Sequence, residues 1–138
     1  SGPLKMFLSN KIVEKNLEYQ VELMGKLPRE EVIYLLSKAD LFLLPSLIET
    51  FGVVLIEAMS MGLPVVATKS GGPESIVVND KLGMLTENNS KEFGEATIKC
   101  LSNLKSYDSD YIKNYTVETF SKASICDKLT IEYETLVN

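Results

Sequence analysis

Two glutamates, Glu49 and Glu57, lie eight residues apart and enclose the pair Phe51-Gly52. From Gly52 onward a run of apolar residues predicts a helix, and Gly62 with the proline that soon follows predicts its end. Glu49 would then precede the helix, while Glu57 would lie about a turn and a half inside it. The first N–H groups of a helix lack partners within it and form the positive end of its dipole, which favours a phosphate or diphosphate. Carboxylates on either side could accept hydrogen bonds from a sugar and a ribose, so the pattern predicts a nucleotide-sugar site.

The elements that would position these carboxylates alternate between helix and strand patterns. This alternation predicts an α/β fold, with a Rossmann-like parallel sheet covered by helices on both faces. Ligands of such sheets bind outside the carboxyl ends of the strands, so the loops 45–51 and 68–73 should meet at one edge and form a single site. The predicted helices cover residues 3–16, a stretch from Pro28, a stretch from Gly52, residues 90–104 with Ser90 as the cap, and residues 117–136; the predicted strands cover 19–24, 41–44 and 64–67, with shorter elements at 76–78 and 84–85.

Composition and charge narrow the class of protein. With 138 residues, 45% of them apolar and 24% charged, the chain is expected to form one soluble globular domain over residues 1–138. The net charge of −5 disfavours nucleic acid as a partner, and no apolar run of about eighteen residues could span a membrane. The sequence has no histidine, which removes a histidine base and the commonest metal ligand. Its two cysteines, Cys100 and Cys126, have no metal-binding spacing and are expected to be reduced, buried thiols of a cytoplasmic protein.

The residues around the two glutamates also carry a family resemblance. The run from Glu49 through Glu57-Ala-Met-Ser-Met-Gly-Leu-Pro-Val-Val-Ala67, together with Gly71-Gly72-Pro73-Glu74, resembles the donor-binding, C-terminal domain of a retaining GT-B glycosyltransferase. The family it resembles is family 4, the glycosyl transferases group 1, which includes many bacterial sugar transferases of polysaccharide biosynthesis. The resemblance extends from the first residues to about Tyr133.

A complete domain of the resembled type begins with two further strands and is preceded by an acceptor domain. The resemblance therefore implies that this chain is an N-terminally truncated fragment, with an exposed sheet edge that invites self-association. It also implies that the fragment alone does not transfer sugar. The acceptor would bind through the missing N-terminal domain.

The resemblance further implies a role for each site residue. Glu49 would contact the transferred sugar and so count as the catalytic residue, while Glu57 would bind the ribose hydroxyls. Phe51, Gly52 and Val53 would offer backbone N–H groups to the sugar and diphosphate, and the Phe51 side chain could simply fill the core.

The glycines of the other loops leave two interpretations open. Gly71 and Gly72 either line the donor cleft or are turn glycines with no ligand role. Gly25 would lie where the family holds the nucleotide base, mostly through backbone contacts. Glu74 is expected to cap the following segment rather than to touch the donor.

The function implied by the resemblance is retaining transfer of a sugar from a nucleotide diphosphate to a saccharide or lipid-linked acceptor. UDP is expected as the carrier more than GDP, and no metal or other cofactor is expected, because the helix dipole would replace the cation. The full-length protein would be cytoplasmic, or peripheral at the inner face of the membrane. The alternatives are a nucleotide-sugar binding module without catalysis, a GT-B nucleotide-sugar epimerase or phosphorylase, and a flavodoxin-like interaction domain.

Overall fold

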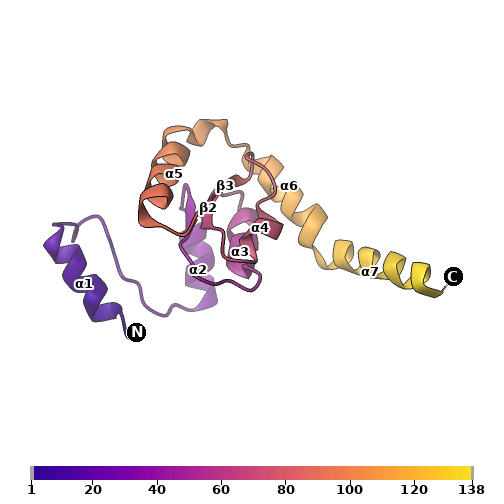
Figure 1. Cartoon of the computed structure of the whole chain (residues 1–138), viewed down its shortest axis with the longest axis horizontal. Helices are drawn as coiled ribbons and strands as arrows, with labels where there is room; N and C mark the ends of the chain where they lie inside the picture. The colour runs from indigo at the N-terminus through magenta and orange to yellow at the C-terminus, as the bar shows by residue number, and fades with distance from the viewer. Residues whose placement is uncertain (1, 138) are drawn as a thin grey trace. The chain divides into compact units, whose positions relative to one another are not determined.

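The computed structural model describes residues 2–137, which form two units that divide between residues 35 and 36 (Figure 1). The first unit contains α1 (Lys5–Glu14), a connecting stretch, and most of α2 (Arg29–Leu36). Both predicted helices are confirmed, although neither buries a residue. Val32 and Leu35 are exposed, whereas Leu36 and Ala39 pack against the core of the second unit.

The strand predicted over residues 19–24 is absent, and this prediction is wrong. Residues 18–20 form a turn, and residues 21–25 have no regular structure. Tyr19, Val21 and Met24 are all exposed. A strand exists only through hydrogen bonds to a neighbouring strand, and the structure gives these residues no such neighbour. The alternating polarity of residues 19–24 is compatible with a strand, but a strand also needs a neighbouring strand to pair with.

The second unit is built on a parallel sheet, which confirms the predicted α/β fold. The strands β1 (Phe42–Leu44), β2 (Val65–Thr68) and β3 (Gly83–Thr86) lie in the order β1-β2-β3. Their register pairs Leu43 with Val66 and Ala67 with Leu85. Every residue of β2 is buried, but Leu43 in β1 is 41% exposed. The strand predicted over residues 41–44 is confirmed as β1, which is an edge strand of this sheet.

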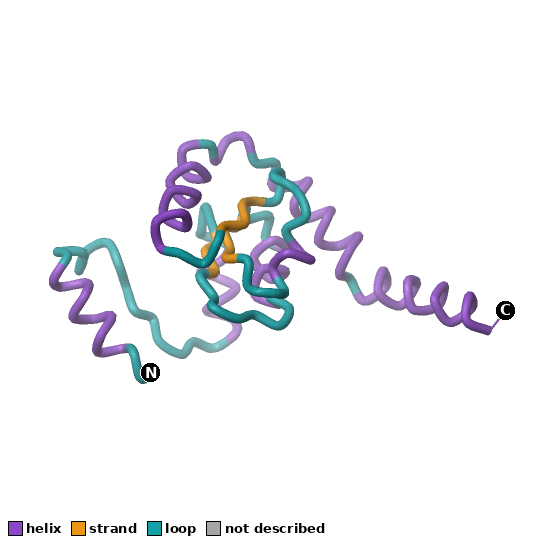
Figure 2. Tube along the Cα trace, in the orientation of Figure 1, coloured by secondary structure: helices purple, strands orange, loops and turns teal. Residues whose placement is uncertain are grey.

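Helices cover the sheet on both faces, as Figures 1 and 2 show for the second unit. Successive residues of a strand point to opposite faces, and β2 follows this rule. Val66 packs with Ala96 and Cys100 of α5 (Ser90–Ser102). The opposite face holds the larger core, whose buried residues come mainly from α3 (Val53–Ser60), α4 (Pro73–Ile76), α6 (Ser109–Phe120) and the strands: Leu55, Ala58, Met59, Leu63, Val65, Ala67, Ile76, Val77, Leu82 and Ile112.

Two helix boundaries differ from the predictions. Asn89, not Ser90, caps α5, because its side chain accepts a hydrogen bond from the N–H of Glu92 (2.9 Å). The single helix predicted over residues 117–136 is two helices, α6 and α7 (Lys122–Val137), separated at Ser121, whose backbone is extended. Asp108 starts α6 by accepting from the N–H groups of Asp110 and Tyr111. A short 3₁₀ turn, Leu104–Ser106, precedes it.

Two further expectations concern the cysteines and a membrane. Cys100 is buried as predicted, but Cys126 is exposed, so that part of the prediction is wrong. Throughout residues 2–137, the helices are too short or too polar to cross a bilayer.

Candidate functional site

The loops that follow β1 and β2 are tied together at the carboxyl edge of the sheet. The Thr68 hydroxyl donates to the carbonyl oxygens of Ser46 (2.5 Å) and Leu44 (3.4 Å). Further along, Glu49 and Gly71 form an isolated parallel β-bridge. The structure therefore brings the two predicted loops together, although they are about twenty residues apart in sequence.

The bridge fixes the backbone of Glu49 on both sides. Its N–H donates to the carbonyl of Ser70 (3.0 Å), and its carbonyl accepts from the N–H of Gly72 (2.8 Å). Gly71 has φ +118, and a β-carbon there would lie 2.9 Å from the Glu49 carbonyl oxygen. Gly71 and Gly72 thus allow the loops to approach closely, and their N–H groups already have protein partners. Whether they also line a donor cleft stays a prediction.

Gly52 ends the first loop and begins α3 in a conformation that favours glycine. Its φ of +98 lies in the left-handed region, and its carbonyl accepts from the N–H of Leu55 (2.8 Å). A β-carbon at Gly52 would meet the side chains of Leu55 and Ile76, so the residue is also packed. Val53 is the first helical residue, and the N–H groups of this first turn point away from the helix at the positive end of its dipole.

The Glu49 carboxylate lies beside this helix start. Its Oε1 accepts a long hydrogen bond from the N–H of Phe51 (3.4 Å), and its Cγ is 3.6 Å from the position of a β-carbon at Gly52. Glu57 lies in the second turn of α3 and is half-buried, next to the buried Ala58. One carboxylate thus precedes the helix start and the other follows it, in the arrangement that the sequence predicted.

The side chain of Phe51 does not fill the core, contrary to one expectation. It is 45% exposed and packs edge-on against the ring of Phe120, the last residue of α6, with the ring centroids 6.2 Å apart. Phe120 in turn packs edge-on against Tyr115. This contact braces the helix start from outside the core and leaves the Phe51 N–H on the Glu49 side.

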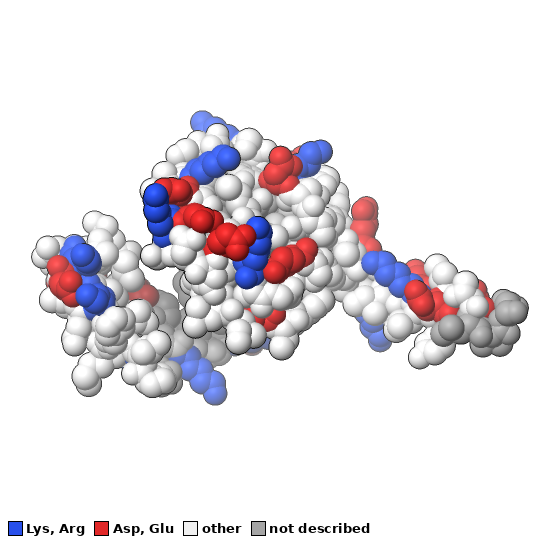
Figure 3. All heavy atoms as spheres, in the orientation of Figure 1, with Lys and Arg blue, Asp and Glu red and all other residues white. Residues whose placement is uncertain are grey.

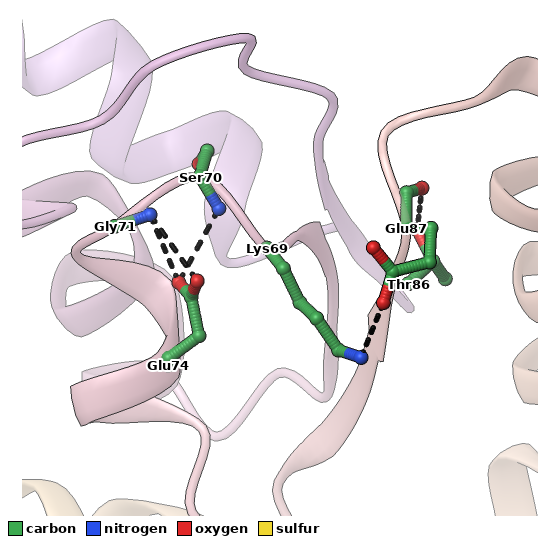
Figure 4. Close-up of polar contacts among 6 residues, drawn as sticks. All are labelled: Lys69, Ser70, Gly71, Glu74, Thr86 and Glu87. Atoms are coloured by element: carbon green, nitrogen blue, oxygen red, sulfur yellow. Dashed lines mark hydrogen bonds and ion pairs between the residues drawn. The ribbon is translucent and has the colours of Figure 1, made fainter.

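A second group of charged residues at the same edge was missed by the sequence analysis (Figure 4). The Lys69 ammonium pairs with the Glu87 carboxylate at 2.5 Å, and this hydrogen bond raises the pKa of Lys69. The pair follows from the register of β2 and β3, in which Thr68 and Thr86 are partners, and only the tertiary structure sets this register. The residues that directly follow paired positions in parallel strands lie side by side.

Glu74 binds the backbone of the loop that precedes α4. Its carboxylate accepts from the N–H groups of Gly71 (3.1 Å) and Ser70 (3.3 Å), as Figure 4 shows. The prediction that Glu74 caps the following segment is therefore wrong: Glu74 lies inside α4, the start of this helix has no side-chain cap, and the carboxylate binds the loop before it.

Gly25, the predicted contact to the nucleotide base, belongs to the first unit. It has φ +72 and lines an apolar groove with Pro3, Leu8 and Met24. The positive φ accounts for a glycine at this position, and its role in base binding stays a prediction.

The electrostatic character of the second unit is mixed. Basic and acidic side chains are interspersed on the face that Figure 3 shows, without a large area of one sign. Within residues 2–137, no three histidine, cysteine, aspartate or glutamate side chains are grouped so that they could hold a metal ion.

The parallel sheet, with the loops of β1 and β2 joined at its carboxyl edge, defines a Rossmann-like α/β domain. Residues 1–116 match the family model described as Glycosyl transferases group 1, and the chain belongs to this family.

Similarity to individual glycosyltransferases supports this assignment. The chain is 34% identical over 103 residues to Uncharacterized glycosyltransferase MJ1178 of Methanocaldococcus jannaschii, covering 74% of this chain and 29% of that protein. It is 39% identical over 90 residues to the amylovoran biosynthesis glycosyltransferase AmsK of Erwinia amylovora, covering 61% of this chain and 22% of that protein. The matched residues therefore span less than a third of the length of these relatives.

Solved structures give the same fold. The Anabaena protein Alr3699/HepE in complex with UDP superposes with a TM-score of 0.80 at 26% identity, covering 94% of this chain and 36% of that chain. The same protein in complex with UDP-glucose gives a TM-score of 0.76 at 25% identity. The fold predicted from the sequence, a parallel α/β part of a GT-B glycosyltransferase, is confirmed.

Proposed function

We propose that this chain binds a nucleotide-diphosphate sugar as the donor-binding domain of a retaining, family 4 glycosyltransferase. The observation that carries the proposal is the position of Glu49 and Glu57 on either side of the α3 start, at the carboxyl edge of the sheet. The similarity to a protein whose structures contain UDP and UDP-glucose supports a UDP-sugar over a GDP-sugar.

Each group at the helix start has a part in the proposed complex. The diphosphate lies at the N–H groups of Phe51, Gly52 and Val53, where the helix dipole stabilises its charge. Glu57 accepts hydrogen bonds from the ribose hydroxyls, and Glu49 accepts them from the transferred sugar. We further propose that no metal ion takes part, since the positive end of α3 supplies the electrostatic stabilisation.

The proposed chemistry replaces one bond at the anomeric carbon with another on the same face. The bond from the anomeric carbon to the diphosphate oxygen breaks, and the acceptor hydroxyl oxygen forms the new glycosidic bond. The departing phosphate oxygen takes the acceptor's proton, so no protein base is required. The domain contributes by orienting the donor and by stabilising the departing diphosphate with preorganised N–H groups. A saccharide or lipid-linked acceptor would bind outside this chain.

Calorimetric titration of the 138-residue chain with UDP, UDP-glucose and GDP tests the proposal. We expect UDP and UDP-glucose to bind and GDP to bind more weakly. Glu95→Gln serves as the matched control, because Glu95 is an exposed carboxylate of α5, on the opposite face of the sheet. A chain that binds none of the three nucleotides would contradict the proposed function. Analysis of the products of the intact protein then distinguishes transfer from epimerisation.

A further inference from the structure

Glu74 reaches backwards from α4 to the loop before it. It is the second residue of α4, after Pro73, and its Oε2 accepts from the N–H of Gly71 (3.1 Å) and of Ser70 (3.3 Å). Oε1 also lies 3.3 Å from the Gly71 nitrogen. Pro73 restricts the backbone between the loop and the helix, because its ring fixes φ. The carboxylate therefore binds the loop from a position on α4 that directly follows Pro73, as Figure 4 shows.

The same short loop holds Glu49. Ser70 accepts from the Glu49 N–H and Gly72 donates to the Glu49 carbonyl, so the residues on both sides of Gly71 bind the Glu49 backbone. Gly71 itself has φ +118. A glycine backbone can adopt many other conformations unless hydrogen bonds hold it in one. The two hydrogen bonds that the Glu74 carboxylate accepts from the N–H groups of Ser70 and Gly71 favour the conformation that forms the bridge.

We propose that Glu74 is a positioning residue for Glu49: it holds the loop 70–72, and this loop holds the Glu49 carboxylate at the start of α3. The proposal rests on the proposed function, because Glu49 must contact the transferred sugar for its position to affect binding. In this series of hydrogen bonds, Glu74 itself contacts only the backbone N–H groups of Ser70 and Gly71.

Charge and positioning predict opposite effects for the loss of Glu74. A carboxylate near the α3 start repels a diphosphate, so its removal would strengthen binding if charge alone mattered. If Glu74 positions Glu49, its removal weakens binding of the sugar nucleotide. Glu74→Gln separates the two effects, because one amide oxygen can replace Oε2 and accept both hydrogen bonds without the charge.

The first measurement needs no ligand. Amide hydrogen exchange of the 138-residue chain reports the protection of the Glu49 and Gly72 N–H groups, which close the bridge. In Glu74→Ala we expect exchange at both amides to accelerate about 10-fold or more, while Glu74→Gln stays near the wild type. If Glu74→Ala fails to fold, Glu74→Asp keeps the charge and shortens the side chain, and should accelerate the same amides. Unchanged exchange in the Ala and Asp variants would overturn the proposal.

The second measurement compares UDP with UDP-glucose. In Glu74→Ala we expect affinity for UDP-glucose to fall about 5- to 10-fold and affinity for UDP to change less than about 2-fold, with Glu74→Gln restoring both. Glu87→Gln is the charge control, since it removes the same charge at the end of β3 without a bond to the loop N–H groups. Tighter or unchanged UDP-glucose binding in Glu74→Ala would overturn the proposal. A wild type that binds neither nucleotide would instead contradict the proposed function, and the exchange rates would still decide whether Glu74 holds the loop.

Discussion

A β-carbon on Gly72 would lie 2.2 Å from the carbonyl oxygen of Phe51, so the chain after β2 passes directly against the chain before α3. No side chain other than hydrogen fits in this space, because the atoms it would meet belong to the backbone. Gly72 itself has φ −69, so the requirement for glycine comes from the close approach alone.

Gly72→Ala should therefore destabilise the chain by about 1–3 kcal/mol, because the two loops must separate to accept the methyl group. Urea unfolding of the variant and the wild type measures the difference. Gly94→Ala is the matched control: a β-carbon there meets no atom within 4 Å, and the residue lies inside α5. It should stabilise the chain by about 0.5–1 kcal/mol. Equal stability of Gly72→Ala and the wild type would mean that the loops can part at no cost.

Glu57→Ala should weaken binding of UDP by about 1–3 kcal/mol, because two hydrogen bonds to the ribose would be lost. Calorimetry with UDP measures this, and circular dichroism checks that α3 remains folded. Unchanged affinity for UDP in a folded variant would show that Glu57 does not bind the ribose.

Glu49→Ala should separate binding from transfer. Because the proposed contact is to the transferred sugar and strengthens in the transition state, UDP affinity should be nearly unchanged while transfer by the intact protein falls roughly 100-fold. Both quantities are measured on the same variant. A parallel loss of UDP affinity and transfer would show that Glu49 mainly shapes the loop that it forms with Gly71.

The stability of the chain should fall above about pH 10, partly because of Tyr107. Burial raises the pKa of the Tyr107 phenol, and its hydrogen bond with the Cys100 thiol (3.0 Å) raises it further. The neutral phenol is thus favoured in the folded chain, so its contribution is fully present below the unfolded pKa of about 10 and is lost as the pH rises through the folded value.

Urea unfolding between pH 8 and pH 11 measures this dependence. Tyr107→Phe should make the fall above pH 10 less steep, whereas Tyr19→Phe, which alters a fully exposed side chain, is the control. A pH dependence of Tyr107→Phe as steep as that of the wild type would show that other groups account for the loss.

The sequence alone determined the features that depend on neighbouring residues and on hydrophobic periodicity. The helix that begins after Gly52 follows from the apolar run and from a glycine at its start, and the buried strand β2 follows from its continuous apolar residues. The alternation of such elements was enough to predict a parallel sheet, and the sheet placed the loops of Glu49 and Gly71 at one edge. These features are local, or follow from the general rules of parallel sheets.

Only the tertiary structure decided the features that need a partner far along the chain. Residues 19–24 have the pattern of a strand, but no strand lies beside them to form the hydrogen bonds that a strand requires. Phe51 lies against Phe120, and Lys69 against Glu87, through contacts that no local spacing encodes. Glu74 is close to the loop 70–72 in sequence, but its connection to Glu49 exists only because this loop binds the Glu49 backbone. Such contacts join residues that are distant in sequence, and these residues become neighbours only when the sheet and its loops have formed.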